Sequence, residues 1–376
     1  MHSIWEQRSF LARPDLAVVG AGLVGLFAAL HAKRLHPGWK VVVLERGPHP
    51  SGASVRNAGF ACFGSPSELL ADIAAEGEAT ALRRVEERWK GLLELRAELG
   101  DAAIGFEPSG GHEIYGVNDP LYNQVAEGFD RLNVLLADIT GPGTYRWLPD
   151  GPARFGLALT SHIVRTDLEG PVDTGRLMRS LLAKVSEAGV EMHFGQDVQR
   201  LENADDGVDL VLANGHTLNA RQVLVATNGY ARQLLPALDI EPARGQVLLT
   251  EPVPGLKLKG TFHANEGYFY FRDYEGRVLL GGGRHLDKAG ERTWDDGTTP
   301  LIMGSLEDLL RTTILPDQNV AIVHRWSGVM GFRAKGKEPL VARVAPNVLV
   351  AAGLSGMGVA IGVRVARRAV GLIVHP

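Results

Sequence analysis

The glycine pattern near the N-terminus constrains the fold of this chain more than any other feature. Gly20, Gly22 and Gly25 form G-x-G-x-x-G directly after a short apolar run and at the start of a segment with helical spacing of apolar residues. A second apolar run follows and ends at Glu45. In such a unit the glycines permit a tight turn, close approach to a pyrophosphate and close packing of helix on strand, while the acid accepts hydrogen bonds from a ribose. The pattern therefore predicts a parallel β-α-β unit that binds a dinucleotide, without separating NAD from FAD.

The remainder of the chain indicates a parallel sheet that is interrupted by an antiparallel one. A strand, a glycine turn and a helix return near the C-terminus, at "NVLVAAGLSGMGVAIG", while alternating strands recur between residues 241 and 323. The stretch from Ser67 to Leu99 has helical periodicity. We therefore expect an α/β fold with a Rossmann-type nucleotide-binding domain interrupted by an antiparallel-sheet substrate domain. The first domain is expected to comprise residues 1–66, 160–238 and 324–376, and the second residues 67–159 and 239–323.

Composition excludes several classes of protein. The net charge of −4 provides no basic surface for nucleic acid. The single cysteine excludes an internal disulfide framework and is typical of a reducing compartment. The most apolar stretches are shorter than the roughly 20 residues that a membrane span requires, and the N-terminus lacks the apolar segment of a secretory signal. We therefore expect a cytoplasmic protein with no nucleic-acid partner, no transmembrane segment and no metal site.

Further segments carry a resemblance to a known family through their order and spacing. They are "GASVRNAGF", "VLVATNGY", "PARGQVL", "GRVLLGGGR" and "WSGVMGF". From Asp15 to the C-terminus the chain resembles the D-amino-acid-oxidase-type family of FAD-dependent oxidoreductases, which includes glycine oxidase, sarcosine oxidase and gamma-glutamylputrescine oxidase. The resemblance implies that the dinucleotide is FAD. The C-terminal cysteine that anchors flavin covalently in some relatives is absent, so we expect non-covalent FAD.

The resemblance also implies which residues contact FAD. The pyrophosphate side is expected at Gly20, Gly22, Leu23, Val24 and Gly25, and the ribose and adenine side at Glu45, Arg46 and, through its backbone, Val198. Ala226 and Thr227 are expected to close over the nucleotide, and the pyrimidine end of the flavin is expected at Gly353, Leu354, Ser355, Gly356, Met357 and Gly358. A helix N-terminus directed at that end stabilises the negative charge that reduction places on the ring.

The segment from residue 51 to 64, "SGASVRNAGFACFG", follows the second predicted strand and is rich in small residues. In the family the corresponding loop runs from the pyrophosphate to the face of the isoalloxazine. The resemblance implies hydrogen bonds to phosphate or ribityl oxygens from Ser54, Arg56 and Asn57, and contact along the ring from Ala58, Gly59 and Phe60. Cys62 has apolar neighbours and no nearby base or cation, so we expect a buried apolar residue rather than a redox thiol.

With FAD bound, the expected chemistry is hydride transfer from a substrate C–H bond to flavin N5. The resemblance implies a small amine or amino acid as substrate, an imine as product and oxygen as electron acceptor. Substrate carboxylates in the family are held by an arginine and tyrosines of the antiparallel sheet. The candidates here are Tyr268, Tyr270 and Arg272, which would share one face of a strand, and Arg333. Alternatively, this face packs on helices, with Arg272 paired to Asp273 or Glu275.

The sequence leaves the electron acceptor and the class of function open. Sarcosine-oxidase relatives place a lysine by the flavin to promote reaction with oxygen, and the matching stretch here, "RVLLGGGRH", has none. Lys335 or Lys337 could substitute, although we expect both on an exposed loop, and His285 is a weaker candidate for a base. The main alternative is a FAD-dependent 2-hydroxy-acid dehydrogenase that passes electrons to a quinone or another carrier. A flavin-binding protein without turnover and an NAD dehydrogenase are further alternatives.

Overall fold

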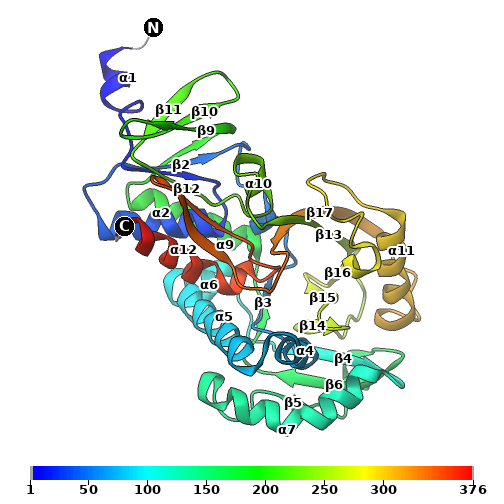
Figure 1. The fold of residues 1–376 in the computed structure, drawn as a ribbon. Helices are drawn as coiled ribbons and strands as arrows, with labels where there is room; N and C mark the ends of the chain where they lie inside the picture. Colours follow the sequence, from blue (N-terminus) through cyan, green and yellow to red (C-terminus); the bar gives the residue numbers. More distant parts are fainter. Residues whose placement is uncertain (1–2, 375–376) are drawn as a thin grey trace.

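The computed structural model describes residues 3–374, which form two main sheets that lie side by side (Figure 1). The six-stranded sheet has the order β18-β19-β12-β1-β2-β8 and is parallel except for β18, which pairs antiparallel with β19. Its strands are β1 Leu16–Val19, β2 Val41–Glu45, β8 Glu191–Phe194, β12 Gln222–Val225, β18 Leu340–Ala345 and β19 Val348–Ala352. Strands β1, β2 and β19 are buried along their whole length, as is typical of parallel strands covered on both faces.

Three helices cover one face of the six-stranded sheet, and a small antiparallel sheet covers the other. The helices are α2 Leu23–Leu35, α9 Thr174–Glu187 and α12 Gly358–Val374. The strands of the small sheet are β9 Val198–Ala204, β10 Gly207–Leu212 and β11 Thr217–Ala220. Side chains of β1 alternate between the two layers, because Leu16 and Val18 pack with the helices while Ala17 and Val19 pack with the small sheet.

The eight-stranded sheet has the order β17-β13-β16-β15-β14-β4-β6-β5 and is antiparallel except at the pairing of β14 with β4. Its strands are β4 Gly111–Gly116, β5 Arg146–Trp147, β6 Thr160–Thr166, β13 Glu241–Thr250, β14 Thr261–Ala264, β15 Phe269–Tyr274, β16 Arg277–Gly282 and β17 Ile322–Phe332. Helix α11, Pro300–Leu309, packs on one face around Phe262, Phe271 and Leu280. The other face of β13, β15 and β16 is turned toward the six-stranded sheet.

A set of helices lies in the lower half of Figure 1, below the six-stranded sheet and near strands β4, β5 and β6 of the eight-stranded sheet. The main ones are α4 Pro66–Glu76, α5 Glu78–Leu99 and α7 Pro120–Thr140. The helical stretch predicted for residues 67–99 is present as two helices that are separated at Gly77, whose φ of 85° lies outside the helical region. Within residues 3–374, no helix is both long and apolar enough to cross a membrane.

Short elements complete the described chain. They are α1 Ile4–Arg8, α3 Ala53–Arg56, β3 Phe60–Ala61, α6 Asp101–Ile104, α8 Gly151–Phe155, β7 Gly170–Pro171, η1 Asn228–Tyr230, α10 Ala231–Leu234, η2 Arg284–Asp287 and η3 Leu310–Ile314. The predicted fold class is confirmed, since a Rossmann-like parallel sheet and an antiparallel sheet are both present. The predicted domain boundaries stay a proposal. Strands β6 and β17, from segments assigned to the nucleotide-binding domain, lie in the eight-stranded sheet.

The contact between α5 and α12 depends on the absence of a side chain at Gly91. A Cβ at this position would lie 2.0 Å from the carbonyl oxygen of Ala360 in the first turns of α12. By contrast, a Cβ on Gly371, near the other end of α12, would meet nothing within 4 Å. The backbones of the two helices therefore approach closely near the start of α12, whereas Gly371 lies at an exposed position.

We expect Gly91→Ala to lower the free energy of unfolding by about 1–3 kcal/mol, because the added methyl group forces backbone apart in a packed interface. The matched control is Gly371→Ala, which is expected to leave stability unchanged or raise it by up to about 1 kcal/mol, since alanine favours a helix over glycine. Urea unfolding of both variants measures the difference. Equal stability of the two variants would contradict this account of the contact.

Candidate active site

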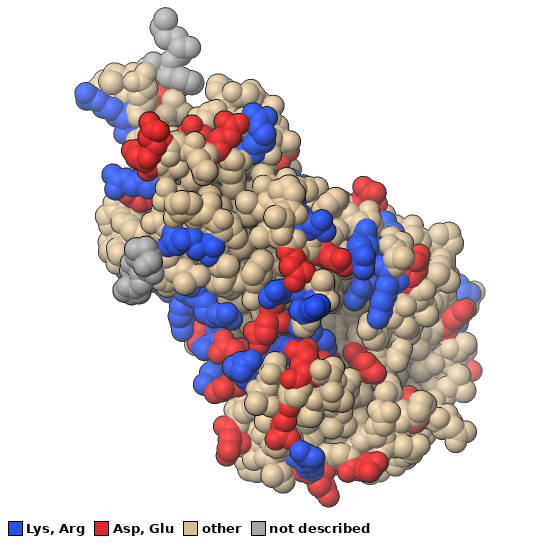
Figure 2. Space-filling view, in the orientation of Figure 1, with Lys and Arg blue, Asp and Glu red and all other residues tan. Residues whose placement is uncertain are grey.

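A cavity of about 860 Å³ lies between the two sheets. It is lined by the carboxyl ends of β1, β2 and β12, by the start of α12 and by the inner face of β13, β15 and β16. Ligands of open α/β sheets bind outside the carboxyl ends of the parallel strands. Figure 2 shows basic and acidic side chains gathered around a hollow near the middle of one face of the molecule. The cavity is therefore the place where the predicted site residues are expected to meet.

The turn between β1 and α2 has the geometry that its glycines predict. Gly20 has a φ of 105°, and a Cβ on Gly25 would lie 1.9 Å from the carbonyl oxygen of Gly20. The buried carboxylate of Glu45 accepts a hydrogen bond from the backbone N–H of Ala21 at 3.0 Å and so fixes the turn to the end of β2. The cavity is lined here by Gly20, Gly22, Leu23 and Val24. Because the first N–H groups of a helix have no partner within it, the start of α2 is suited to phosphate.

The polar side chains of α3 are already bonded to other parts of the protein. The hydroxyl of Ser54 accepts from the N–H of Leu23 at 2.9 Å, and Arg56 pairs with Asp296 at 2.6 Å. The amide of Asn57 donates to two carbonyls of its own helix and accepts one N–H of the following turn. All three predicted residues line the cavity. These bonds fix the shape of the wall, while their direct bonds to a cofactor stay a prediction.

The apolar part of the same segment continues along the cavity. Ala58, Phe60 and Cys62 line it, whereas Gly59 does not. Gly59 has a φ of 74°, and a Cβ there would lie 2.3 Å from the carbonyl oxygen of Val172. Cys62 is 6% exposed, and burial raises the pKa of its thiol well above the usual value. The thiol therefore stays protonated, which agrees with the expectation of an apolar role.

The turn from β19 to α12 closes another side of the cavity. The side-chain oxygen of Asn228 accepts from the N–H groups of Gly353 at 3.0 Å and Leu354 at 3.4 Å, so η1 holds this turn in place. Sequence reasoning missed Asn228, although it lies in the polar turn after β12. The hydroxyls of Thr227 and Ser355 are buried, line the cavity and have no hydrogen-bond partner in the described chain. The cavity is also lined by Leu354, Gly356, Met357 and Gly358.

The opposite end of the cavity fits an aromatic base and its ribose. Arg46, at the end of β2, lies over the ring of Tyr230 at 4.0 Å. Val198 and Ala226 line the cavity nearby. With two helix starts, a glycine turn at each, and two unpartnered hydroxyls, the residues present fit a dinucleotide of the size of FAD. Of the predicted cofactor residues, only Gly25, Gly59 and Gly353 lie outside the lining.

Of the predicted substrate residues, the structure brings Tyr268 and Tyr270 to the cavity and keeps Arg272 away from it. The Arg272 guanidinium donates to the carbonyl oxygens of Gly59 and Val172, both at 2.8 Å. The reason is that the backbone near Gly59 passes over this end of β15 and covers the arginine. The alternative pairing with a neighbouring acid is also wrong for Asp273, because the carboxylate of Asp273 pairs with Lys259 instead.

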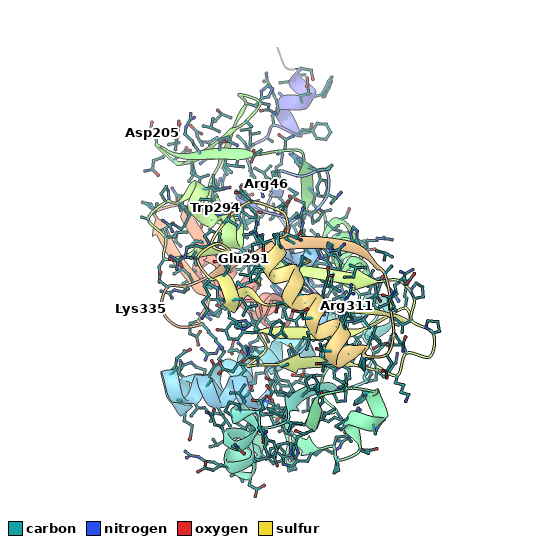
Figure 3. The ribbon with its side chains drawn as sticks, turned by 90° about the vertical axis from the view of Figure 1, so that its right-hand side faces the viewer. Arg46, Asp205, Glu291, Trp294, Arg311 and Lys335 are labelled. Atoms are coloured by element: carbon teal, nitrogen blue, oxygen red, sulfur yellow. The ribbon has the colours of Figure 1, made fainter. Side chains whose placement is uncertain are left out.

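The other predicted cations lie in different places. Arg333 does not line the cavity and pairs with Asp239 at 3.2 Å. Lys335 is exposed on the loop between β17 and β18 (Figure 3). Lys337, two residues further on, lines the cavity, so the expectation of an exposed lysine is wrong at this position. His285 bonds to Asn265 at 3.2 Å and does not line the cavity.

Arg284 is the cation that sequence reasoning missed. It follows Gly283 at the end of β16, the strand that pairs with β15, and it lines the cavity. Its guanidinium lies 4.4 Å from the ring of Phe332 and has no ion pair or hydrogen bond among residues 3–374. Burial lowers the pKa of Arg284, but an arginine keeps its charge. The signal in the sequence was an arginine directly after a run of glycines that ends a strand.

Two paired residues of the cavity wall, Tyr270 and His263, are kept uncharged by burial. Burial raises the pKa of Tyr270 to about 12, so its phenol remains a donor. Burial likewise lowers the pKa of His263 to about 4, so the imidazole is neutral at physiological pH. The His263 ring packs against Phe60 with the ring centroids 5.1 Å apart. Arg284 therefore shares the cavity wall with the protonated phenol of Tyr270 and the neutral imidazole of His263.

The chain belongs to the family of FAD dependent oxidoreductases, whose family model matches residues 15–372. The bifunctional protein ThiO/ThiG of Trichormus variabilis is 28% identical over 252 residues, which are 65% of this chain and 36% of that protein. This chain thus spans less than two fifths of the length of that relative.

Solved structures of low sequence identity share the fold. L-proline dehydrogenase from P. horikoshii has a TM-score of 0.77 at 17% identity, covering 96% of this chain and 94% of that chain. Glycine oxidase from Geobacillus kaustophilus has a TM-score of 0.74 at 22% identity, covering 96% of this chain and 95% of that chain. Family membership confirms the predicted family and supports FAD as the cofactor that the cavity fits.

Glu169 supports the segment that leads away from the cavity, and it gives a pH-dependent prediction. Its carboxyl group is 2% exposed and accepts from the N–H groups of Phe63 at 2.8 Å and Gly64 at 3.4 Å. Burial raises the pKa of Glu169 to about 8. The folded protein therefore favours the protonated form, and the stability that Glu169 contributes is present below its ordinary pKa and is lost as the pH rises through 8.

We expect Glu169→Gln to remove this loss, since glutamine keeps the accepting oxygen and does not ionise. The free energy of unfolding of the wild type should fall relative to the variant by up to about 1.4 kcal/mol per pH unit between pH 5 and 8. Urea unfolding at several pH values measures both curves. Parallel curves for the two proteins would show that Glu169 does not titrate in this range.

Proposed function

We propose that this chain catalyses the FAD-dependent oxidation of a small amine or amino acid to the imine, with oxygen accepting the electrons. The observation that carries the proposal is the position of Arg284, an unpaired cation beside Tyr268 and Tyr270 on the cavity wall. A planar guanidinium with two phenol donors is suited to a carboxylate, because the fork of N–H groups matches the two carboxylate oxygens. This arginine takes the role that the sequence assigned to Arg272 or Arg333.

The remaining residues favour a neutral amine next to that carboxylate. His263 is uncharged, and Phe60, Val247 and Met330 supply apolar surface to the same cavity. This apolar part of the wall disfavours an ammonium group, so an amine placed against it binds in its neutral form. When bound, FAD supplies the two-electron acceptor for the substrate C–H bond. The Asn228 side chain keeps the turn before α12 in position, and the protonated phenol of Tyr270 holds its proton for hydrogen bonding rather than proton transfer.

The decisive experiment is an anaerobic screen of amines, amino acids and 2-hydroxy acids against the FAD-loaded protein, read as bleaching of the flavin band. We expect amino acids to bleach it, and peroxide to form when air is admitted. Bleaching by a 2-hydroxy acid and by no amine would favour the dehydrogenase instead. Absence of bleaching by every compound would favour a flavin protein without turnover.

We further propose that FAD is held without a covalent bond. The turn at residues 353–358 contains no cysteine, and Cys62 is buried with a raised pKa, so its thiolate is not available for attachment. Denaturation in acid should therefore release the flavin into the supernatant. Flavin that remains with the precipitated protein would contradict non-covalent binding.

Substitution of the two arginines separates substrate binding from stability. We expect Arg284→Met to raise KM for a carboxylated substrate by about 10–100-fold, since a hydrogen-bonded charge contributes about 1.5–3 kcal/mol, while the melting temperature stays close to that of the wild type. We expect Arg272→Met to lower the free energy of unfolding by about 2 kcal/mol or more, because buried carbonyls lose their donor. Steady-state kinetics and thermal unfolding measure the two effects.

The control is Lys288→Met, which removes a positive charge 5.4 Å from the Tyr268 ring at an exposed position outside the cavity lining. Its KM should remain within about twofold of the wild type, because an exposed charge is screened by solvent and salt. An equal rise in KM for Lys288→Met and Arg284→Met would mean that general electrostatics, rather than a direct contact, explains the effect.

A further inference from the structure

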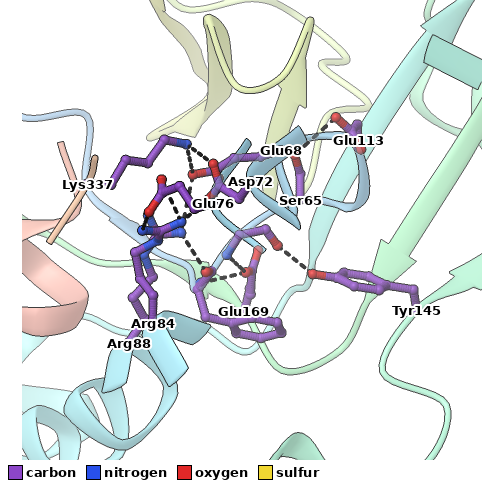
Figure 4. Close-up of polar contacts among 12 residues, drawn as sticks. Ser65, Glu68, Asp72, Glu76, Arg84, Arg88, Glu113, Tyr145, Glu169 and Lys337 are labelled. Atoms are coloured by element: carbon purple, nitrogen blue, oxygen red, sulfur yellow. Dashed lines mark hydrogen bonds and ion pairs between the residues drawn. The ribbon is translucent and has the colours of Figure 1, made fainter. Parts of the chain in front are cut away.

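Helix α4 turns three carboxylates toward the cavity. Glu68, Asp72 and Glu76 recur at every fourth residue and therefore share one face of the helix. Together with Ala71 and Ala75 they line the cavity. We call Glu68, Asp72 and Glu76 the α4 acidic face (Figure 4). None of these residues has a role in the cofactor or carboxylate contacts described above.

Two arginines of α5 neutralise the α4 acidic face from behind. Arg84 lies 3.0 Å from Asp72 and 2.8 Å from Glu76, and Arg88 lies 3.2 Å from Glu68. Both arginine side chains are only 2% exposed. Arg88 also donates to a backbone carbonyl at 3.0 Å. These two cations are fixed by burial and cannot leave without unfolding the α4–α5 pair.

The third positive charge comes from Lys337, on the cavity side. Its ammonium lies 2.6 Å from an Asp72 oxygen and 3.2 Å from a Glu68 oxygen. Burial alone would raise the pKa of Glu68, but Arg88 and Lys337 outweigh burial and hold it at about 2. With only the two arginines, three carboxylates would leave one uncompensated negative charge in a buried wall, which is strongly unfavourable.

Lys337 differs from the arginines in being replaceable. Its side chain is 34% exposed and extends from a loop, which is also fixed by the pairing of Arg333 with Asp239. The loop therefore keeps an anchor when the lysine side chain moves. The other oxygen of Asp72 is buried and is paired with the Arg84 guanidinium at 3.0 Å. Of the three cations that pair with the α4 acidic face, Lys337 has the most exposed side chain.

We propose that the α4 acidic face is a binding site for a primary alkylammonium group, which the Lys337 side chain occupies when no such ligand is bound. The chemistry of the ligand follows from the occupant, because Lys337 presents a primary ammonium on a methylene chain to these two carboxylates. A ligand ammonium that displaces it restores the same charge balance. The displaced lysine then extends into solvent beside Lys335.

The ammonium site also indicates the chemical class of the substrate, an inference that rests on the proposed function. Arg284 and the α4 acidic face line the same cavity. A substrate that carries a carboxylate and, in addition to its reacting amine, a second ammonium group would use both. The substrate class is therefore a diamino acid or a carboxylated diamine rather than a simple apolar amino acid.

The site is tested by calorimetric binding of n-butylammonium chloride to the FAD-loaded protein, with tetramethylammonium chloride as a cation without N–H donors. Lys337→Met removes the resident ammonium, and Lys335→Met is the matched control on the same loop. We expect Lys337→Met to bind butylammonium at least about tenfold more tightly than the wild type and Lys335→Met. In those two proteins the ligand must first displace the Lys337 ammonium from its charge-assisted hydrogen bonds, whereas in Lys337→Met it does not. Equal affinity in all three proteins, or equal binding of tetramethylammonium, overturns the proposal.

Melting temperatures, measured with and without each cation, show whether a change in binding by Lys337→Met reflects the site or a loss of stability. Lys337→Met leaves a carboxylate unbalanced, so its melting temperature should fall, and butylammonium but not tetramethylammonium should raise it again. In the double variant Lys337→Met/Glu68→Gln, Arg84 and Arg88 balance the two remaining carboxylates, so stability should return and tight butylammonium binding should be lost. Tight binding by the double variant would place the ammonium elsewhere and overturn the proposal.

The substrate class is tested separately by anaerobic flavin bleaching with lysine and norleucine, which differ in the terminal ammonium. We expect a preference for lysine in the wild type and a stronger one in Lys337→Met. If norleucine bleaches the flavin at the same concentration as lysine, the proposed substrate class is wrong. If butylammonium binds as expected and no amine or amino acid of the screen bleaches the flavin, the ammonium site stands and the proposed oxidation is wrong.

Discussion

The guanidinium of Arg272 joins the antiparallel sheet to the segments that lead into the parallel sheet. It extends from β15 of the antiparallel sheet and donates to the backbone carbonyls of Gly59, just before β3, and of Val172, just after β7. Those carbonyls belong to segments that connect to the parallel sheet through α3 and α9. A charged donor shared among buried carbonyls is a strong constraint, because each carbonyl left without it would be desolvated and unpaired. This contact therefore fixes β15 of the antiparallel sheet to the backbone on either side of the short β3–β7 pair.

The nucleotide end of the cavity could be predicted from sequence because its determinants are local. Gly20, Gly25 and Glu45 lie within one β-α-β unit, and each is required by the geometry of the turn itself. The same holds for the glycine turn before α12. The fold class followed from the same patterns, since the strands of the parallel sheet are continuously apolar and those of the antiparallel sheet alternate.

The substrate end could not be predicted to the same depth, because it depends on contacts between distant segments. Strand alternation placed Arg272 on the same face as the tyrosines, but it could not show that the backbone near Gly59 covers that residue. Arg284 lies after a glycine run, where no periodicity predicts the direction of a side chain. Lys337 was expected to be exposed because loop lysines usually are, and only the acids of α4, far away in sequence, draw it inward. Asn228 was missed for a similar reason, since its partners are more than a hundred residues away.

The charge balance of the α4 acidic face constrains the order in which the structure can form, because its last counter-charge comes from a segment near the C-terminus. The two arginines come from α5, directly after α4, but the ion pair of Glu68 with Lys337 spans 269 positions. The segment that carries this lysine also leads into β18 and β19, which complete one edge of the parallel sheet. During synthesis the α4–α5 pair is therefore made long before its last counter-charge exists. A fragment that stops short of this loop would lack both the sheet edge and electrical neutrality, so the cavity wall is finished only when nearly the whole chain is present.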